Sequence, residues 1–213
     1  DGKKDVLGIW INENESATFW TEVFEEIKAR GVEEILFISL DGLSGLSEAI
    51  EKIYPKAKTQ RCIVHIVRNI YGILDKKKSK EIIGDLKKIY TASNGNNAKL
   101  EYENFIEKYE SNEKLIKKLN SVIEHIFNIF EYPVEIRKII YTTNPIESLN
   151  SSLRKVTRGK GSFISKEALL KVLYLRIKDL EKSWSKGTKN WDNVKHQLIE
   201  LYGERVLKYY FNT

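Results

Sequence analysis

A short, continuous apolar run dominates the first quarter of the chain: Ile35-Leu36-Phe37-Ile38-Ser39-Leu40, closed by Asp41-Gly42. A run of this length that ends in a turn dipeptide predicts a strand buried on both faces, and helices must then cover it. Helix-spaced apolar residues flank the run at 19–27 and 46–53, and short strands are predicted at 6–11 and 58–61. The alternation of strands and helices indicates an α/β layer.

After Cys62 the apolar residues change to helical spacing. Residues 66–138 therefore read as a mostly helical block, in which the polar stretches 75–80 and 93–97 are expected to be connectors. Helical spacing resumes at three further segments, 145–156, 165–184 and 191–211. The first of the upstream helices is expected to be capped by Asn14 or Ser16 and to end at Gly31.

These patterns divide the chain into an α/β core, a helical insertion and a helical tail. The expected boundaries are 1–65 for the first part of the core, 66–138 for the insertion, 139–184 for the second part of the core and 185–213 for the tail. Asp1-Gly2-Lys3-Lys4 has turn chemistry but no strand before it, and methionine is absent. We therefore expect an internal fragment that is cut inside a hairpin.

Composition excludes several classes of protein. Apolar residues make up 41% and charged residues 31% of the 213 residues, which argues against a disordered chain, and no apolar run approaches the length of a membrane span. One cysteine excludes a disulfide framework and fits a reducing compartment. The net charge of +6 suits a polyanionic partner, although this signal is weak by itself.

Asp41 follows the predicted buried strand directly. The carboxyl edge of an open α/β sheet is where ligands and catalytic groups are placed, so Asp41 is a candidate acid. The alternative is that Asp-Gly only makes a turn, and local sequence favours it.

Glu147 is a second candidate acid, in the segment Thr142 to Asn150. Asn144 suits an N-cap and Pro145 a first helical position, which makes Glu147 the capping-box residue and gives it a structural alternative role. The helix is expected to bury Ile146, Leu149, Leu153 and Val156, and to present Glu147, Asn150, Ser151 and Arg154 on its polar face.

Cys62 and His65 form a single C-x-x-H pair at the predicted start of a helix. A structural zinc site needs four ligands, and neither His125 nor His196 has ligand spacing with another residue. Cys62 also reads as a small buried residue, and residues three apart on one helix make a poor nucleophilic triad.

The segment from Arg154 to Gly161 combines four cations, Arg154, Lys155, Arg158 and Lys160, with a glycine-containing loop. Such an arrangement can bind phosphates, but cations at a helix C-terminus also suit the helix dipole. The lysine-rich stretch 75–80 reads as a solvated connector.

Together these segments resemble the catalytic region of bacterial Mutator-type insertion-sequence transposases, relatives of the eukaryotic Mutator-like elements. The resemblance covers roughly residues 1–184. The stretches that carry it are 1–8, 31–46, Gln60-Arg61-Cys62-Ile63-Val64-His65-Ile66-Val67-Arg68-Asn69, 132–141, Thr142-Thr143-Asn144-Pro145-Ile146-Glu147-Ser148-Leu149-Asn150, 154–157 and 161–163.

The resemblance implies an RNase H-like core with an Asp-Asp-Glu triad, interrupted by a helical insertion between the second and third acids. Asp41 then matches the second acid and Glu147 the third, while the first acid lies upstream of Asp1 and is missing. Cys62 and His65 match a signature that lies near the active site and is not a zinc finger, and they join the two acids as candidate catalytic residues. Mg²⁺ or Mn²⁺ is implied as the cofactor, because a pair of such ions held by carboxylates drives in-line displacement at phosphorus.

The resemblance also implies the partners and the place of action. The expected partner is DNA, both transposon ends and target, contacted by the cations of 154–160. The full-length protein is expected to form a homo-oligomer and to have no membrane partner. Its expected location is the bacterial cytoplasm, in association with the nucleoid. Two hypotheses follow: an enzyme that cleaves and transfers DNA strands, or a non-catalytic DNA-binding or assembly module from a truncated or decayed transposase. With two of three acids, the chain alone is expected to be inactive.

Overall fold

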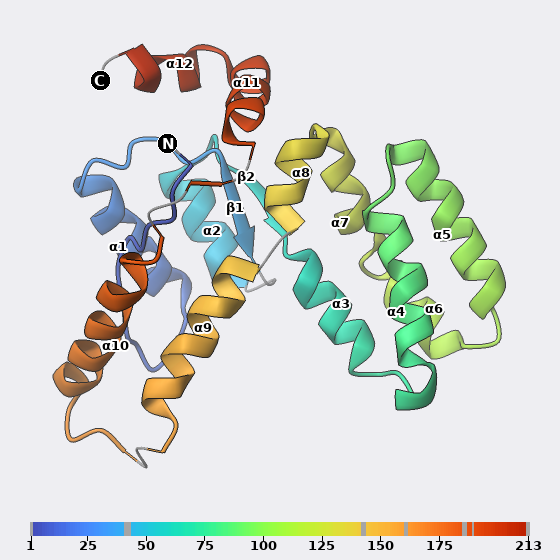
Figure 1. Ribbon diagram of the computed structural model, residues 1–213, viewed down its shortest axis with the longest axis horizontal. Helices are drawn as coiled ribbons and strands as arrows, with labels where there is room; N and C mark the ends of the chain where they lie inside the picture. Colours follow the sequence, from blue (N-terminus) through green and yellow to red (C-terminus); the bar gives the residue numbers. More distant parts are fainter. Residues whose placement is uncertain are drawn as a thin grey trace. The chain divides into compact units, whose positions relative to one another are not determined.

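The structure is a computed structural model that describes residues 2–40, 44–141, 144–159, 162–184, 187–188 and 190–211. Within these ranges, the side chains of Ser44, Asn144, Pro145, Glu147, Tyr210 and Phe211 are not described. The chain divides into two compact units. We call Ile35–Ser44 with Lys56–Thr142 the central unit, and Asp1–Glu34, Gly45–Pro55 and Thr143–Thr213 the terminal unit (Figure 1).

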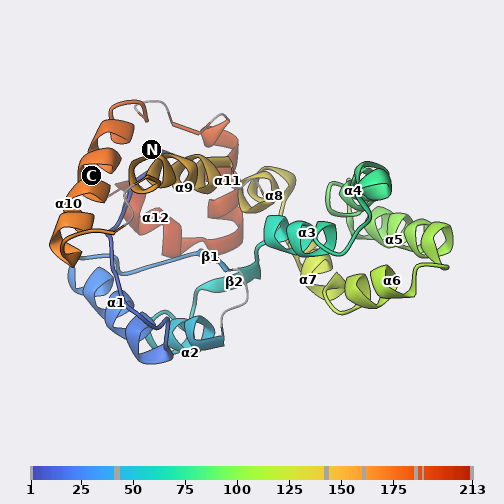
Figure 2. The same cartoon turned by 90° about the horizontal axis from the view of Figure 1, so that it is seen from below.

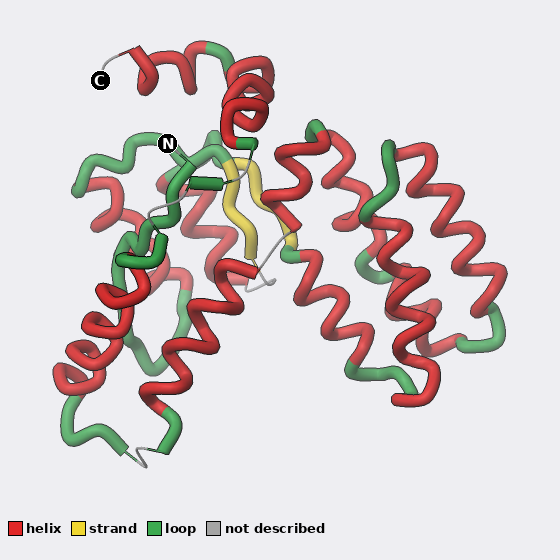
Figure 3. The backbone as a smooth tube through the Cα atoms, in the orientation of Figure 1, coloured by secondary structure: helices red, strands yellow, loops and turns green. Residues whose placement is uncertain are grey.

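Two parallel strands form the sheet of the central unit, drawn in yellow in Figure 3. Strand β1 (Phe37–Leu40) pairs with β2 (Lys58–Arg61) so that Phe37 lies opposite Lys58 and Leu40 opposite Arg61. Both strands are where the sequence predicts them.

The expectation that β1 is buried on both faces is wrong. Its apolar side chains are only half-buried, and Ser39 is exposed. Among the described residues β1 has one strand neighbour, and the ring of Phe37 packs edge-on against Tyr132 with centroids 4.9 Å apart. An apolar run therefore identified the strand but overestimated how much of it is covered.

Helices make up the remainder of the central unit, and Figures 1 and 2 show them grouped around one interior. They are α3 (Ile63–Tyr71), α4 (Lys76–Tyr90), α5 (Gly95–Tyr109), α6 (Glu113–Asn120), α7 (Ile123–Phe127), the 3₁₀ helix η1 (Asn128–Glu131) and α8 (Val134–Tyr141). Their most buried side chains include Ile70, Leu86, Ile89, Phe105, Leu115, Leu119, Ile126 and Ile129. The predicted helical character of this stretch is confirmed.

Two of the expected connectors instead begin helices. Asp75 caps α4 because its carboxylate accepts a hydrogen bond from the amide of Lys77, and Lys76–Lys80 is helical. Asn94 caps α5 in the same way, through the amide of Asn97. Short polar residues at such positions satisfy the orphan amides of the first turn, so a polar stretch can belong to a helix.

Arg137 anchors α8 to the rest of the central unit. Its side chain is 6% exposed and donates hydrogen bonds to the carbonyls of Ala92 (3.0 Å) and Ser93 (2.8 Å), in the turn between α4 and α5. The guanidinium also stacks over the ring of Phe130 at 4.8 Å. A buried cation thus fixes the helix that leads toward Glu147 in sequence.

The terminal unit contains α1 (Ala17–Ala29), α2 (Ser44–Ile53), α9 (Asn144–Thr157), α10 (Lys166–Glu181), α11 (Trp191–Tyr202) and α12 (Glu204–Phe211). Ser16 caps α1 by accepting from the amide of Phe19, which confirms one of the two predicted caps. The ring of Tyr54 packs edge-on against Phe24, and its hydroxyl donates to the carbonyl of Val32 at 2.7 Å. These contacts bind the end of α2 to α1.

Helices α9 and α10 pack against each other as an antiparallel pair (Figure 1). The predicted helix over 191–211 is two helices, because Gly203 takes a positive φ of 50° between α11 and α12. Arg205 then holds α12 to the loop after α1 by donating from Nε (3.1 Å) and Nη2 (2.7 Å) to one carboxylate oxygen of Glu34.

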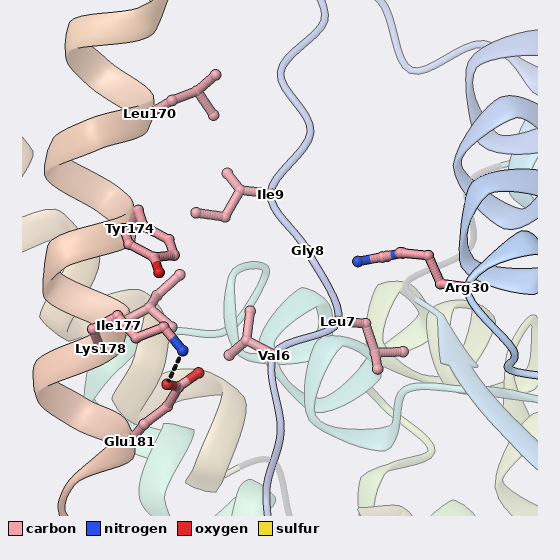
Figure 4. A pocket seen from close by; sticks show the side chains of 10 residues that line it. All are labelled: Val6, Leu7, Gly8, Ile9, Arg30, Leu170, Tyr174, Ile177, Lys178 and Glu181. Carbon is pink, nitrogen blue, oxygen red and sulfur yellow. Dashed lines mark hydrogen bonds and ion pairs between the residues drawn. The ribbon is translucent and has the colours of Figure 1, made fainter.

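The strand predicted at 6–11 is absent. Residues 6–11 follow an extended path along α10 (Figure 4), but no described segment forms a β-ladder with them. Trp10 donates from Nε1 to Glu26 at 2.7 Å and lies under the guanidinium of Arg30. The alternation of side chains predicted an extended segment correctly, but a strand also requires a hydrogen-bonding neighbour.

The start of the chain is held by residues near its end. The carbonyl of Gly2 accepts hydrogen bonds from the amide (2.8 Å) and hydroxyl (2.9 Å) of Thr188. Gly2 has a φ of 66°, and a Cβ there would meet the ring of Trp191, so this contact requires glycine. In the part of the chain that the structure describes, no helix is long and apolar enough to cross a membrane.

Candidate active site

The carboxyl ends of both strands meet the start of α3. The amide of Cys62, the residue after β2, donates a hydrogen bond to the carbonyl of Leu40, the last residue of β1, with an N···O distance of 2.7 Å. Asp41 and Gly42 lie outside the described residues. In sequence, Asp41 directly follows Leu40, whose carbonyl is bonded to the C-x-x-H segment.

Gln60 supports this end of the sheet from inside the central unit. It is 3% exposed, and its Nε2 donates to the carbonyls of Arg61 (3.0 Å) and His125 (2.7 Å). His125, isolated in sequence, therefore contributes a carbonyl; burial, followed by the charge of Arg61, lowers the pKa of its side chain. Nothing in the sequence distinguishes Gln60 as a supporting residue, because β2 is all polar. Only the fold shows that this side chain points inward.

Cys62 and His65 lie at the start of α3, as predicted. Cys62 is the N-cap residue and is 5% exposed, which agrees with its reading as a small buried residue. His65 follows within the first turn, half-buried, and its Nδ1 is enclosed with no hydrogen-bond partner among the described residues. It is one of several buried side-chain atoms without a partner among the described residues, and each such atom costs about 1–3 kcal/mol.

Among the described residues, no three His, Cys, Asp or Glu side chains lie close enough together to hold a metal ion. Asp41 lies outside these residues, and the side chain of Glu147 is not described.

Glu147 lies in the first turn of α9, which begins at Asn144. Its side chain is not described, so neither the capping role nor the catalytic role is tested. Asp41 belongs to the central unit and Glu147 to the terminal unit, and their convergence stays a prediction.

The packing of α9 differs in one respect from the expectation. Leu149, Leu153 and Val156 are half-buried where burial was predicted, Ile146 is 54% exposed, and Ser152 is buried. The buried face is rotated away from Ile146, which lies at its edge. Asn150, Ser151 and Arg154 are exposed, as expected for the polar face.

The basic end of α9 presents free cations. Arg154 and Lys155 lie in its last turn and Arg158 follows, with its amide bonded to the carbonyl of Arg154 at 2.8 Å. All three side chains are exposed, and none forms an ion pair with a described carboxylate. Gly159 has a φ of 93° and ends the segment; Lys160 lies outside the described residues.

Residues 1–187 match the family described as "Transposase, Mutator family". A probable transposase for an ISRM3-like insertion sequence of Sinorhizobium fredii is 36% identical over 207 residues, which cover 96% of this chain and 52% of that protein. The ISRM3 transposase of Rhizobium meliloti gives the same identity and coverage.

A probable insertion-sequence transposase of Corynebacterium diphtheriae is 36% identical over 85% of this chain and 53% of its own length. The chain thus spans about half the length of the curated relatives that it matches. The match extends across both units and includes the Gln60–Asn69 and Thr142–Asn150 motifs. The chain belongs to the Mutator family of transposases.

Proposed function

We propose that this chain supplies part of the catalytic core of an insertion-sequence transposase, which cleaves DNA strands at transposon ends and transfers them to target DNA. The observation that carries the proposal is the Cys62–Leu40 hydrogen bond, because it joins the C-x-x-H pair to the strand that Asp41 follows. Family membership supports the reaction class. The parallel pair β1–β2 fits an RNase H-like core, which we propose as the fold around the site.

Asp41 and Glu147 are the proposed metal ligands, as second and third acids of an Asp-Asp-Glu triad whose first Asp lies outside this chain. Two carboxylates suit Mg²⁺ or Mn²⁺, which prefer hard oxygen donors. When bound, such ions would activate the attacking oxygen and stabilise the leaving one during displacement at phosphorus. The chain's own part is to hold the two carboxylates on a strand end and on a helix.

In this proposal Cys62 and His65 position the site and do not contact the reacting atoms. Cys62 fixes the start of α3 to the end of β1. His65 lies in the first turn of α3, and its ring Nδ1 is enclosed without a hydrogen-bond partner among the described residues. We assign both residues to positioning the Asp41 segment.

DNA is the proposed partner of the basic end of α9. Arg154, Lys155, Arg158 and Lys160 follow Glu147 on the same helix and its exit loop, so they lie within a few helical turns of the proposed ligand. Contacts from such cations go to phosphates and set the position of the backbone without reading its sequence. Assembly of the full-length protein as a homo-oligomer is part of the proposal.

Strand cleavage by the full-length transposase tests the proposal. Asp41→Asn and Glu147→Gln should each abolish Mg²⁺-dependent cleavage of a transposon-end duplex while DNA binding stays at the wild-type level. Asp192→Asn, which removes an exposed carboxylate of α11, is the matched control and should cleave normally. Cleavage that survives in either test variant overturns the assignment; binding without cleavage by the wild-type protein favours the non-catalytic module.

A further inference from the structure

The positive charge of the chain is concentrated in one stretch. Residues 56–142 contain 17 Lys and Arg against 11 Asp and Glu, whereas the rest of the chain contains 19 of each. The whole net charge of +6 therefore lies in the stretch that forms most of the central unit. The basic end of α9 belongs to the terminal unit and does not account for this excess.

Three lysines of α4 project from the face opposite its buried side. Lys77, Lys80 and Lys87 are exposed, and at 100° per residue they fall on the side of the helix away from Ile82 and Leu86. We call these lysines, together with Gly84 between them, the α4 lysine face.

The acids near this face are already engaged. Asp75 accepts from the amide of Lys77 as the helix cap, Glu81 pairs with Lys108 at 2.7 Å, and Asp85 pairs with Lys88 at 2.8 Å. The ammonium groups of the α4 lysine face consequently form no ion pair with any carboxylate among the described residues. A row of unneutralised cations is a binding surface for a polyanion.

Gly84 lies at the centre of the face and has no role in packing. A Cβ built at this position meets nothing within 4 Å, and its φ is not positive. Glycine in an exposed helix interior weakens the helix relative to alanine, so the fold itself gives no reason for it. A glycine does leave the middle of the face flat, which lets another backbone approach the helix closely.

We propose that the α4 lysine face binds the phosphate backbone of duplex DNA, as a second contact surface separate from the end of α9. From Lys77 to Lys87 the helix rises about 15 Å, which passes roughly four phosphates of one strand. The inference rests on the proposed function for the identity of the polyanion. It adds a role for the helical insertion, which the proposed chemistry leaves without one.

Salt-dependent binding of a labelled duplex of arbitrary sequence to the full-length protein tests the surface. The variant Lys77→Ala/Lys80→Ala/Lys87→Ala should bind roughly tenfold or more weakly and lose about three units of salt slope. The control Lys99→Ala/Lys114→Ala/Lys117→Ala removes the same charge from exposed lysines of α5 and α6. Equal losses in both triples mean that diffuse charge is responsible, and they overturn the proposal.

Gly84→Gln provides a test at constant charge. The longer residue should raise the melting temperature, because glutamine is the better helix former, yet weaken DNA binding severalfold by blocking close approach. Unchanged DNA affinity in Gly84→Gln and in the lysine triple overturns the inference. Loss of self-association in these variants would assign the face to a second copy of the chain and also overturn it. If the inference fails but cleavage still depends on Asp41 and Glu147, the proposed function stands without this surface.

Discussion

The amide nitrogen of Cys62 lies 2.7 Å from the carbonyl oxygen of Leu40. The bond extends the β1–β2 ladder by one residue and joins it to Cys62, the N-cap residue of α3. A short motif, C-x-x-H, is thereby built into the end of the sheet. The motif therefore lies at the end of the strand that Asp41 follows in sequence.

Replacement of Arg137 should destabilise the central unit. Arg137→Ala removes two buried hydrogen bonds to the Ala92 and Ser93 carbonyls and the contact with Phe130, at a cost of about 2–4 kcal/mol in the free energy of unfolding. Urea denaturation measures the loss. Lys138→Ala is the control, since Lys138 is half exposed and its ion pair with Glu135 spans a single helical turn. A loss there as large as that of Arg137→Ala contradicts the prediction.

The contribution of Asp85 to stability should depend on pH. Hydrogen bonds from Lys108 and Lys88 hold the pKa of its carboxyl below the ordinary value of 3.8. Because this pKa is lower in the folded state, the ionised carboxylate stabilises the folded state at pH values above 3.8. The stabilisation is lost as the pH falls through the folded-state pKa. Both lysines are about half exposed, which limits the contribution to about 1 kcal/mol.

Asp85→Asn should therefore unfold more easily than wild type at neutral pH, and the difference should shrink as the pH falls below 3.8. Unfolding curves measured across this range check the prediction. Glu103→Gln, an exposed carboxylate of α5, should show no such trend. A difference between Asp85→Asn and wild type that is constant with pH would show that charge is not its cause.

Local sequence predicted the elements that depend on local chemistry. Ser16 accepts the amide of Phe19, and the helix of α1 follows as the apolar spacing indicated. Strand β2 lies where a short strand was predicted, at 58–61, although its four residues are all polar. The start of α4 was missed because Asp75 can either sit in a loop or cap a helix, and sequence alone does not decide between these uses.

Non-local pairing could not be predicted in the same way. The 6–11 segment has the alternation of a strand, but only the neighbouring backbone decides whether it becomes one. The burial of Arg137 depends on carbonyls that lie 44 and 45 residues away. In the site, the start of α3 at Cys62 was predicted, whereas the bond to Leu40 required the parallel register of β1 and β2.

The clamp between α12 and the loop after α1 should be measurable by hydrogen exchange. Arg205→Ala removes two hydrogen bonds to Glu34, whose side chain is 17% exposed, and should speed amide exchange in Glu204–Phe211. Glu34→Gln should act in the same direction, and the double variant should be no worse than the larger single effect. Fully additive effects would show that the two side chains do not act as a pair.

Cations at the end of α9 should set general DNA affinity. Arg154→Ala/Arg158→Ala should weaken binding to all duplexes alike and reduce the salt slope by about two units. Anisotropy titrations against salt measure both quantities. Lys52→Ala/Lys171→Ala removes two exposed cations elsewhere in the terminal unit and should change neither; unchanged binding in the α9 variant would leave these residues with a helix-terminus role only.

The most direct test asks whether Asp41 and Glu147 share one metal site. Fe²⁺ replaces Mg²⁺ at carboxylate sites and, with peroxide, generates radicals that cut the nearby backbone, and mass spectrometry locates the cuts. In the full-length transposase we expect Mg²⁺-competed cuts near both residues, and Asp41→Asn or Glu147→Gln should remove both cuts together. Cuts near only one of the residues, or cuts that persist in both variants, would contradict the shared site.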